Sequence, residues 1–146
     1  MMLSQSFFNE MEFYITPSEV IEFLYCKRFT YYMKCLKISQ NQENRYKVQK
    51  GRDIHEKKKR ENINYLRKKL KITKKLIDIN LVSKKYKVKG IVDEILIDEG
   101  DYMVPIDYKF AVYDEKIYKT YKTQMVLYSI MIEEIYDYDC ANKLAI

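Results

Sequence analysis

The chain has 146 residues, of which 47% are hydrophobic and 33% charged, with a formal net charge of +6. This length and composition predict one soluble globular domain with a real core. No apolar run approaches the roughly 18 residues that cross a bilayer, and the N-terminal MMLSQSFFNEMEFY carries acids where a signal peptide carries Lys or Arg. We therefore expect a cytoplasmic protein with no membrane partner.

The first clear signal along the chain is a helix start. Thr16 can cap the helix, Pro17 suits its first position, and Glu19 completes a capping box. Residues 1–15 give no periodic signal and predict either a loose arm or an added strand. Four apolar residues recur at helical spacing, so we expect that side of the helix to be buried: Val20, Ile21, Phe23 and Leu24.

The segment 25–32, YCKRFTYY, places Lys27 and Arg28 among aromatic residues. Interleaved aromatic and basic side chains can stack nucleic-acid bases and hold phosphates. The same pattern is also typical of a buried aromatic helix with its charged residues at the rim. Both interpretations stay open at this point, and a polar segment at 40–46 predicts the loop that follows.

The next stretch, GRDIHE at 51–56, leads into a basic run. Between Lys57 and Lys75, ten Lys or Arg residues stand against one acid, Glu61. Such a run is either a solvated helix face or a surface for a polyanion, and we expect nucleic acid. His55 is the only histidine; it is either an ordinary packed or exposed residue or a nitrogen ligand to a metal ion. The candidate DNA-binding residues are Lys57, Lys58, Lys59, Arg60, Arg67, Lys68 and Lys69.

Residues 87–110, KVKGIVDEILIDEGDYMVPIDYKF, predict a β-hairpin, and a short strand at 76–82 precedes it. The arms at 86–97 and 102–110 are rich in Val and Ile, and DEGD at 98–101 supplies the turn residues. We therefore expect this hairpin to lie in a central sheet.

Folding this hairpin about Gly100, with a one-residue bulge, places Asp93 almost opposite Ile106 and Asp107. Lys109 then shares a strand face with Asp107. Two carboxylates so close repel each other unless a cation lies between them, and Mg²⁺ is commonly held by one or two protein carboxylates. The pattern indicates a divalent-metal site, although a solvated face of alternating charged and apolar residues also fits it.

A last helix is expected at roughly 121–136, after a polar segment at 111–120. Gln124 and Tyr128 lie four residues apart and so share one face of it, although such a pair alone carries little information. The closing residues KLAI read as a strand that has just begun. We expect a truncated protein or a fragment.

Together these motifs resemble the RecB-like nucleases of the PD-(D/E)XK superfamily, and more closely the CRISPR-associated exonucleases of the Cas-four family. The resemblance covers about residues 16–130 and rests on five motifs in order: TPSEVIEFLYCKRFTYY, Gly51-x-x-x-His55, Gly90-Ile91-Val92-Asp93, Pro105-Ile106-Asp107-Tyr108-Lys109 and Gln124-x-x-x-Tyr128. It implies an α/β fold with a restriction-endonuclease-like core, a mixed central sheet flanked by helices. Residues 1–146 would form one nuclease domain that lacks the cysteine-rich C-terminal part.

The resemblance also implies a role for each matching residue. Lys109 would position or help to activate the attacking water, and Gln124 and Tyr128 would orient the lysine and the DNA strand. The implied ligands of Mg²⁺ or Mn²⁺ are three side chains and one backbone carbonyl: His55, Asp93, Asp107 and the carbonyl of Tyr108. The implied activity is metal-dependent exonucleolytic cleavage of single-stranded DNA ends, trimming spacer precursors in CRISPR adaptation alongside the integrase proteins of that system.

The family usually carries an iron–sulfur cluster on four cysteines. Cys26 matches the early ligand, whereas Cys35 and Cys140 stand at unsuitable positions, so we expect no complete cluster. Two alternatives remain open for the function. One is a DNA-binding or adaptor subunit that keeps the nuclease fold without full activity. The other is an orphan or viral RecB-like nuclease unrelated to CRISPR adaptation.

Overall fold

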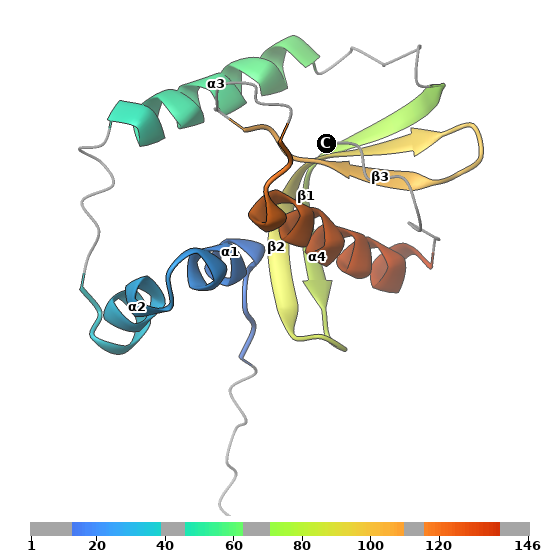
Figure 1. Cartoon of the computed structure of the whole chain (residues 1–146). Helices are drawn as coiled ribbons and strands as arrows, with labels where there is room; N and C mark the ends of the chain where they lie inside the picture. The colour runs from blue at the N-terminus through green and yellow to red at the C-terminus, as the bar shows by residue number, and fades with distance from the viewer. Residues whose placement is uncertain (1–12, 39–45, 63–70, 110–115, 138–146) are drawn as a thin grey trace, which may run out of the picture.

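The fold comes from a computed structural model, which describes residues 13–38, 46–62, 71–109 and 116–137. Helices and strands are both present, as Figure 1 shows. In chain order the elements are the helices α1 (Pro17–Tyr25) and α2 (Lys27–Thr30), the π-helix η1 (Tyr31–Cys35), the helix α3 (Tyr46–Asn62), the strands β1 (Ile72–Ser83), β2 (Val88–Asp98) and β3 (Met103–Ile106), and the helix α4 (Lys119–Tyr136). The predicted α/β class is confirmed. None of the described helices is long and apolar enough to span a membrane.

The three strands form one antiparallel sheet in the order β1-β2-β3. The predicted hairpin is confirmed, because β2 pairs with β3 and Glu94 is the partner of Ile106, which places Asp93 and Asp107 next to this last pair. The second arm is shorter than predicted, since β3 ends at Ile106 and residues 107–109 lie beyond the strand. The strand predicted at 76–82 is longer, at 72–83. A mixed sheet was expected, but the parallel pairing in the described part is a single-residue bridge between Ile15 and Val88.

In the β2–β3 turn, the residue with left-handed backbone is Asp101, whereas the expected bulge was centred on Gly100. The N–H of Asp98 donates to the carbonyl of Tyr102 at 3.2 Å, and Asp101 has a φ of 58° in the left-handed region. The carboxylate of Asp98 accepts hydrogen bonds from the N–H of Gly100 at 2.8 Å and of Tyr102 at 3.0 Å. These local bonds hold the turn, since aspartate tolerates left-handed backbone and readily bonds to nearby N–H groups.

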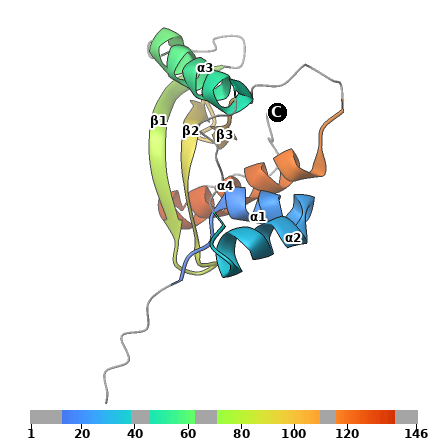
Figure 2. The same cartoon turned by 90° about the vertical axis from the view of Figure 1, so that its left-hand side faces the viewer.

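Helices α1 and α4 cover one face of the sheet, and α3 crosses one end of it (Figures 1 and 2). The core lies between α4 and the strands; its most buried members are Leu81, Val92, Ile95, Met131 and Ile132. At its C-terminal end α4 also holds the β1–β2 turn. The carboxylate of Glu134 accepts hydrogen bonds from the Ser83 hydroxyl and from the N–H groups of Lys84 at 3.0 Å and Lys85 at 3.2 Å.

The start of α1 is confirmed and its burial is only partly as expected. The hydroxyl of Thr16 accepts from the N–H of Glu19 at 3.2 Å, and the Glu19 carboxylate accepts from the N–H of Thr16 at 2.7 Å. Val20 and Ile21 are half-buried beside α4. The prediction was wrong for Phe23 and Leu24, which are 46% and 44% exposed.

The basic run does not form one helix. α3 ends at Asn62, and Lys74 and Lys75 lie on β1. The expected loop at 40–46 falls almost wholly outside the described residues, as do Arg67, Lys68, Lys69, the closing segment 138–146 and Cys140 within it.

Candidate active site

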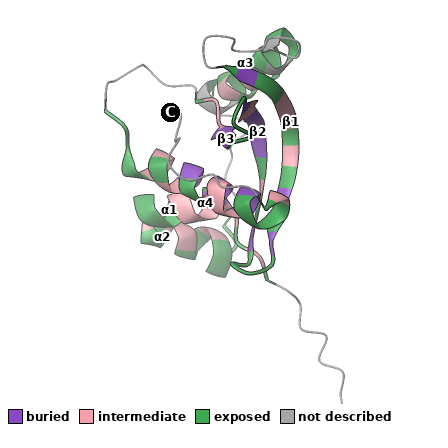
Figure 3. Cartoon of the chain, turned by 90° about the vertical axis from the view of Figure 1, so that its right-hand side faces the viewer, coloured by how far each residue is buried: buried purple, intermediate pink, exposed green. Residues whose placement is uncertain are grey.

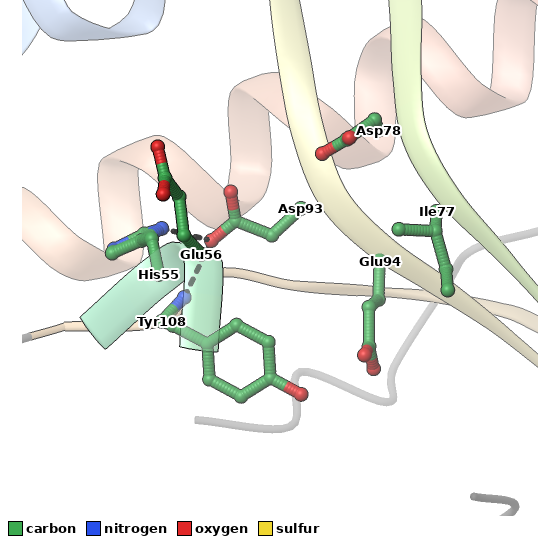
Figure 4. A pocket seen from close by; sticks show the side chains of 7 residues that line it. All are labelled: His55, Glu56, Ile77, Asp78, Asp93, Glu94 and Tyr108. Atoms are coloured by element: carbon green, nitrogen blue, oxygen red, sulfur yellow. Dashed lines mark hydrogen bonds and ion pairs between the residues drawn. The ribbon is translucent and has the colours of Figure 1, made fainter. Parts of the chain in front are cut away.

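The site forms where the pairing of β1 with β2 is interrupted. Ile77 pairs with Glu94 and Ile79 with Val92, and between them Asp78 has a φ of 52°. Val92 and Ile95 both enter the core beneath α4, which strict alternation along β2 would not allow. This irregularity lies at Asp93, whose side chain points toward α3 in Figure 4.

Asp93 joins the hairpin to α3. Its Oδ2 atom accepts a hydrogen bond from the N–H of Tyr108 at 2.8 Å and lies 3.4 Å from Nδ1 of His55. The His55 ring meets the Tyr108 ring edge-on, with 6.3 Å between centroids. Beside them is a pocket of about 170 Å³, lined by His55, Glu56, Ile77, Asp78, Asp93, Glu94 and Tyr108 (Figure 4). The predicted meeting of His55 and Asp93 is therefore present.

Asp107 joins the hairpin to α4. Its Oδ1 atom accepts a hydrogen bond from the amide nitrogen of Gln124 at 3.0 Å, and its Oδ2 atom lies 2.5 Å from the ammonium of Lys109. The same Gln124 nitrogen donates to the Tyr128 hydroxyl at 3.1 Å. The predicted face shared by Gln124 and Tyr128 is thus the face that reaches Asp107.

Gly90 lets the elements around the site approach closely. A Cβ at this position would lie 3.1 Å from Cδ of Pro17 and 3.3 Å from Cε1 of Tyr128. Such contacts are tight, so a larger residue at position 90 would push α1 and Tyr128 away from β2. Through Gly90, the first turn of α1 packs next to a residue of the site.

Burial raises the pKa of two groups at the site. Burial raises the pKa of Asp93 above 3.8, the hydrogen bond from Tyr108 opposes this, and the negative charge of Asp107 adds to it. Burial likewise raises the pKa of Tyr128 to about 12. Tyr128 therefore keeps its proton near neutral pH, and Asp93 is influenced by a second carboxylate nearby.

The donors at this site match a hard divalent cation in type. They include two carboxylates that repel each other and an imidazole. Among the described residues, Oε1 of Gln124 is buried and accepts no hydrogen bond, and the buried Oδ2 of Asp107 has the Lys109 ammonium as its partner. In the described ranges, however, no three His, Cys, Asp or Glu side chains are arranged to hold a metal ion. The reason is local, because both oxygens of Asp107 face Gln124 and Lys109.

The predicted DNA-binding residues are described only in part. Lys57, Lys58 and Arg60 are exposed on α3, the helix that carries His55. Lys57 also lies 3.7 Å from the carboxylate of Glu61. The side chain of Lys59 lies outside the described part, as do residues 67–69. The iron–sulfur candidate Cys26 is a half-buried free thiol, and Cys35 is an exposed one.

Sequence reasoning missed three acids of the pocket, Glu56, Asp78 and Glu94. Glu94 is almost fully buried, and its carboxylate lies 4.0 Å from the ammonium of Lys75, which is also buried. An acid inside an otherwise apolar strand is the signal that could have found Glu94, because a buried charge is costly without a partner. Asp78 is exposed, and its signal is an acid that interrupts the apolar residues of β1.

No protein-family model matches the chain, and no curated protein matches it. The case for a function therefore rests on the geometry of these residues.

Proposed function

We propose that the protein is a metal-dependent deoxyribonuclease of the RecB-like, PD-(D/E)XK type. One observation carries the proposal: the end of the β2–β3 hairpin brings Asp93, Asp107 and Lys109 together with residues from two helices. These partners are His55 from α3 and the pair Gln124 and Tyr128 from α4. Phosphodiester hydrolysis needs such a set, which can hold a cation, neutralise a phosphate and position water.

The proposal gives each residue a part. Asp93, Asp107, His55 and the Tyr108 carbonyl are the groups that would hold Mg²⁺ or Mn²⁺. A divalent cation supplies Lewis-acid polarisation of the phosphate when it is bound. To serve as a ligand, Asp107 must turn one oxygen away from Lys109 or Gln124.

The remaining residues act on the substrate and on each other. The Lys109 ammonium, released from Asp107, positions water and offsets charge that develops on the phosphate oxygens. Gln124 fixes Asp107 and Tyr128 through one amide nitrogen. Tyr128, with a pKa of about 12, serves as a hydrogen-bonding group and not as a base.

The finer proposal names single-stranded DNA ends as the substrate and the trimming of spacer precursors in CRISPR adaptation as the role, with the integrase proteins of that system as partners. The basic side chains of Lys57, Lys58 and Arg60 support DNA as the substrate class, because they are exposed on the helix that carries His55. The adaptation role rests on the sequence resemblance alone.

A second candidate is a DNA-binding subunit without activity. The observation that favours it is the position of Asp107, whose two oxygens face Gln124 and Lys109 and not Asp93. If this arrangement persisted in the presence of metal, the fold would bind DNA and leave it intact.

Degradation of end-labelled single-stranded DNA with Mn²⁺, Mg²⁺ or EDTA distinguishes the two candidates. Lys109→Ala is the test variant, and Lys89→Ala is the control, because Lys89 is an exposed lysine on β2 that pairs with Val82 away from the site. We expect metal-dependent loss of substrate that falls about 100-fold or more in Lys109→Ala and persists in the control. DNA that is bound but stays whole with every metal would replace the nuclease with the binding subunit.

A further inference from the structure

The unit formed by α1, α2 and η1 exposes an unusual set of aromatic rings. Tyr25 is 85% exposed, Tyr31 54% and Tyr32 48%. Of the two interpretations of the segment 25–32, the buried aromatic helix is therefore wrong for these tyrosines. Figure 3 shows α1 and α2 beside α4, with much of their length exposed or half-buried. We call the three tyrosines, together with the exposed basic residues Lys27, Arg28 and Lys37, the aromatic–basic surface.

The backbone of η1 helps to present two of these rings. Residues 31–35 form a π-helix, whose wider turn is rare and is often found at functional sites. Tyr31 and Tyr32 meet edge to face, with 5.8 Å between ring centroids and 62° between ring planes. In this arrangement the two rings do not stack on each other, so ring faces remain available to a ligand.

The charge of this surface has one sign. Residues 25–38 contain four basic residues, Lys27, Arg28, Lys34 and Lys37, and no acid. Lys34 forms an ion pair with Glu19, and Lys27 lies over the Phe23 ring at 5.5 Å from its centroid. The ammonium of Lys34 is thus neutralised within the chain, whereas Lys27, Arg28 and Lys37 are exposed.

We propose that the aromatic–basic surface binds single-stranded nucleic acid, with bases stacked on its tyrosines and phosphates beside Lys27, Arg28 and Lys37. Unpaired bases offer ring faces, and the backbone offers one negative charge per nucleotide, so this ligand matches both features. A second copy of the chain fits less well, because a two-fold contact would set Lys27, Arg28 and Lys37 of one copy against the same basic groups of the other.

Helix α1 connects the aromatic–basic surface to the site. Pro17 begins α1 and lies against Gly90 of β2, where Tyr128 also approaches. Of the elements that carry the surface, α1 packs on α4 and β2, whereas α2 packs on α1 and on η1. A strand bound there would thus be connected to the proposed nuclease centre through α1. The inference rests on the proposed function only in that the bound strand would be its substrate.

Fluorescence anisotropy of a labelled oligothymidine in EDTA, which prevents metal-dependent cleavage, tests the proposal. We compare the wild type with Tyr25→Ala, with Tyr31→Ala/Tyr32→Ala and with Tyr25→Phe, which keeps the ring. The control Tyr102→Ala removes a tyrosine that is 41% exposed at the β2–β3 turn, far from α2 in Figure 1. Because Tyr25 is so exposed, its truncation leaves the core intact.

We expect each alanine variant to bind roughly tenfold more weakly, since stacking of one base is worth about 1–3 kcal/mol. Tyr25→Phe and Tyr102→Ala should bind like the wild type. Lys27→Gln/Arg28→Gln should lower the salt dependence of the affinity. Unchanged binding in both alanine variants would overturn the proposal, and so would a change of oligomeric state in them, which would make the surface a contact between copies.

The two proposals fail separately. If metal-dependent cleavage occurs and the tyrosine variants bind normally, the nuclease stands and the aromatic–basic surface does not. If no metal supports cleavage but the tyrosine variants lose binding, the surface stands and the nuclease does not.

Discussion

Helix α4 takes part in two carboxylate clusters that are built in opposite ways. Near its N-terminal end Gln124 bonds to Asp107, and near its C-terminal end Glu134 bonds to the β1–β2 turn. Both oxygens of Glu134 accept hydrogen bonds, from one hydroxyl and two backbone N–H groups. At the site, Oε1 of Gln124 is buried and accepts none from the described residues, and the buried Oδ2 of Asp107 has only the Lys109 ammonium beside it.

The pKa shifts differ in the same way. The hydrogen bond from Ser83 lowers the pKa of Glu134, and the N–H groups of Lys85 and Lys84 lower it further. Burial raises the pKa of Asp93, and the negative charge of Asp107 adds to the rise. A carboxylate that only stabilises a turn is satisfied within the chain. Two carboxylates held near each other, beside a buried amide oxygen of Gln124 that accepts no hydrogen bond from the described residues, indicate a place for a ligand.

The largest predicted effect is on the rate of DNA cleavage, which should depend on the carboxylate of the site and not on that of the β1–β2 turn. Asp107→Asn should lower the rate of DNA cleavage by roughly 100-fold or more, because it removes a charged ligand while keeping the shape of the side chain. Glu134→Gln should cleave at the wild-type rate. Single-turnover cleavage of labelled DNA measures both variants. A similar loss in both would mean that Glu134 influences the site and that the comparison fails.

The next effect is the stabilisation of the protein by metal. At 100 times its Kd, Mn²⁺ should add about 2.7 kcal/mol to the free energy of unfolding, which corresponds to roughly 10 °C in melting temperature. We expect this rise in the wild type and in Glu134→Gln, and we expect it to be absent in Asp107→Asn. Differential scanning fluorimetry over a Mn²⁺ series measures it, and an equal rise in all three proteins would place the ion elsewhere.

A smaller effect concerns stability without metal. Glu134→Gln should lower the melting temperature by a few degrees, because the neutral amide is a weaker acceptor for the two turn N–H groups and the hydroxyl. Asp107→Asn should leave the melting temperature unchanged or raise it, since it relieves the repulsion with Asp93. Thermal melts in EDTA measure both. A larger loss in Asp107→Asn than in Glu134→Gln would make Asp107 the structural carboxylate of the two.

Local rules were sufficient to predict much of the fold. The capping box at Thr16 and Glu19 needs residues three apart, and the shared face of Gln124 and Tyr128 needs residues four apart. The nearness of Asp93 and Asp107 follows from counting back from one turn. Each prediction depends on geometry that a short segment fixes by itself.

Contacts between segments far apart in the sequence could not be predicted from the sequence. Helical spacing showed which side of α1 is apolar, but in the packing of α1 on α4 only Val20 and Ile21 are half-buried, and Phe23 is exposed. Nothing near Ser83 in the sequence indicates that an acid on α4 bonds to it. The buried ammonium of Lys75 likewise lies beside the carboxylate of Glu94, a residue of the neighbouring strand. These features depend on how elements pack and not on any one element.

The smallest effect is the pH dependence of the Glu134 cluster. Because folding lowers the pKa of Glu134 below 4.5, the unfolded chain binds the proton more readily. The stabilisation is fully present above pH 4.5 and is lost as the pH falls through the lower pKa of the folded state. The gap in melting temperature between the wild type and Glu134→Gln should therefore be constant above pH 4.5 and should shrink below it.

Other acids do not disturb this comparison. Glu19 also has a lowered pKa, because hydrogen bonds from Lys34 and Thr16 outweigh the effect of its burial, but it is present in both proteins and cancels in the difference. The effect is small because Glu134 is exposed to solvent, which screens its charge. A gap that persists unchanged at acidic pH would mean that hydrogen-bond geometry, and not the negative charge of Glu134, holds the β1–β2 turn against α4.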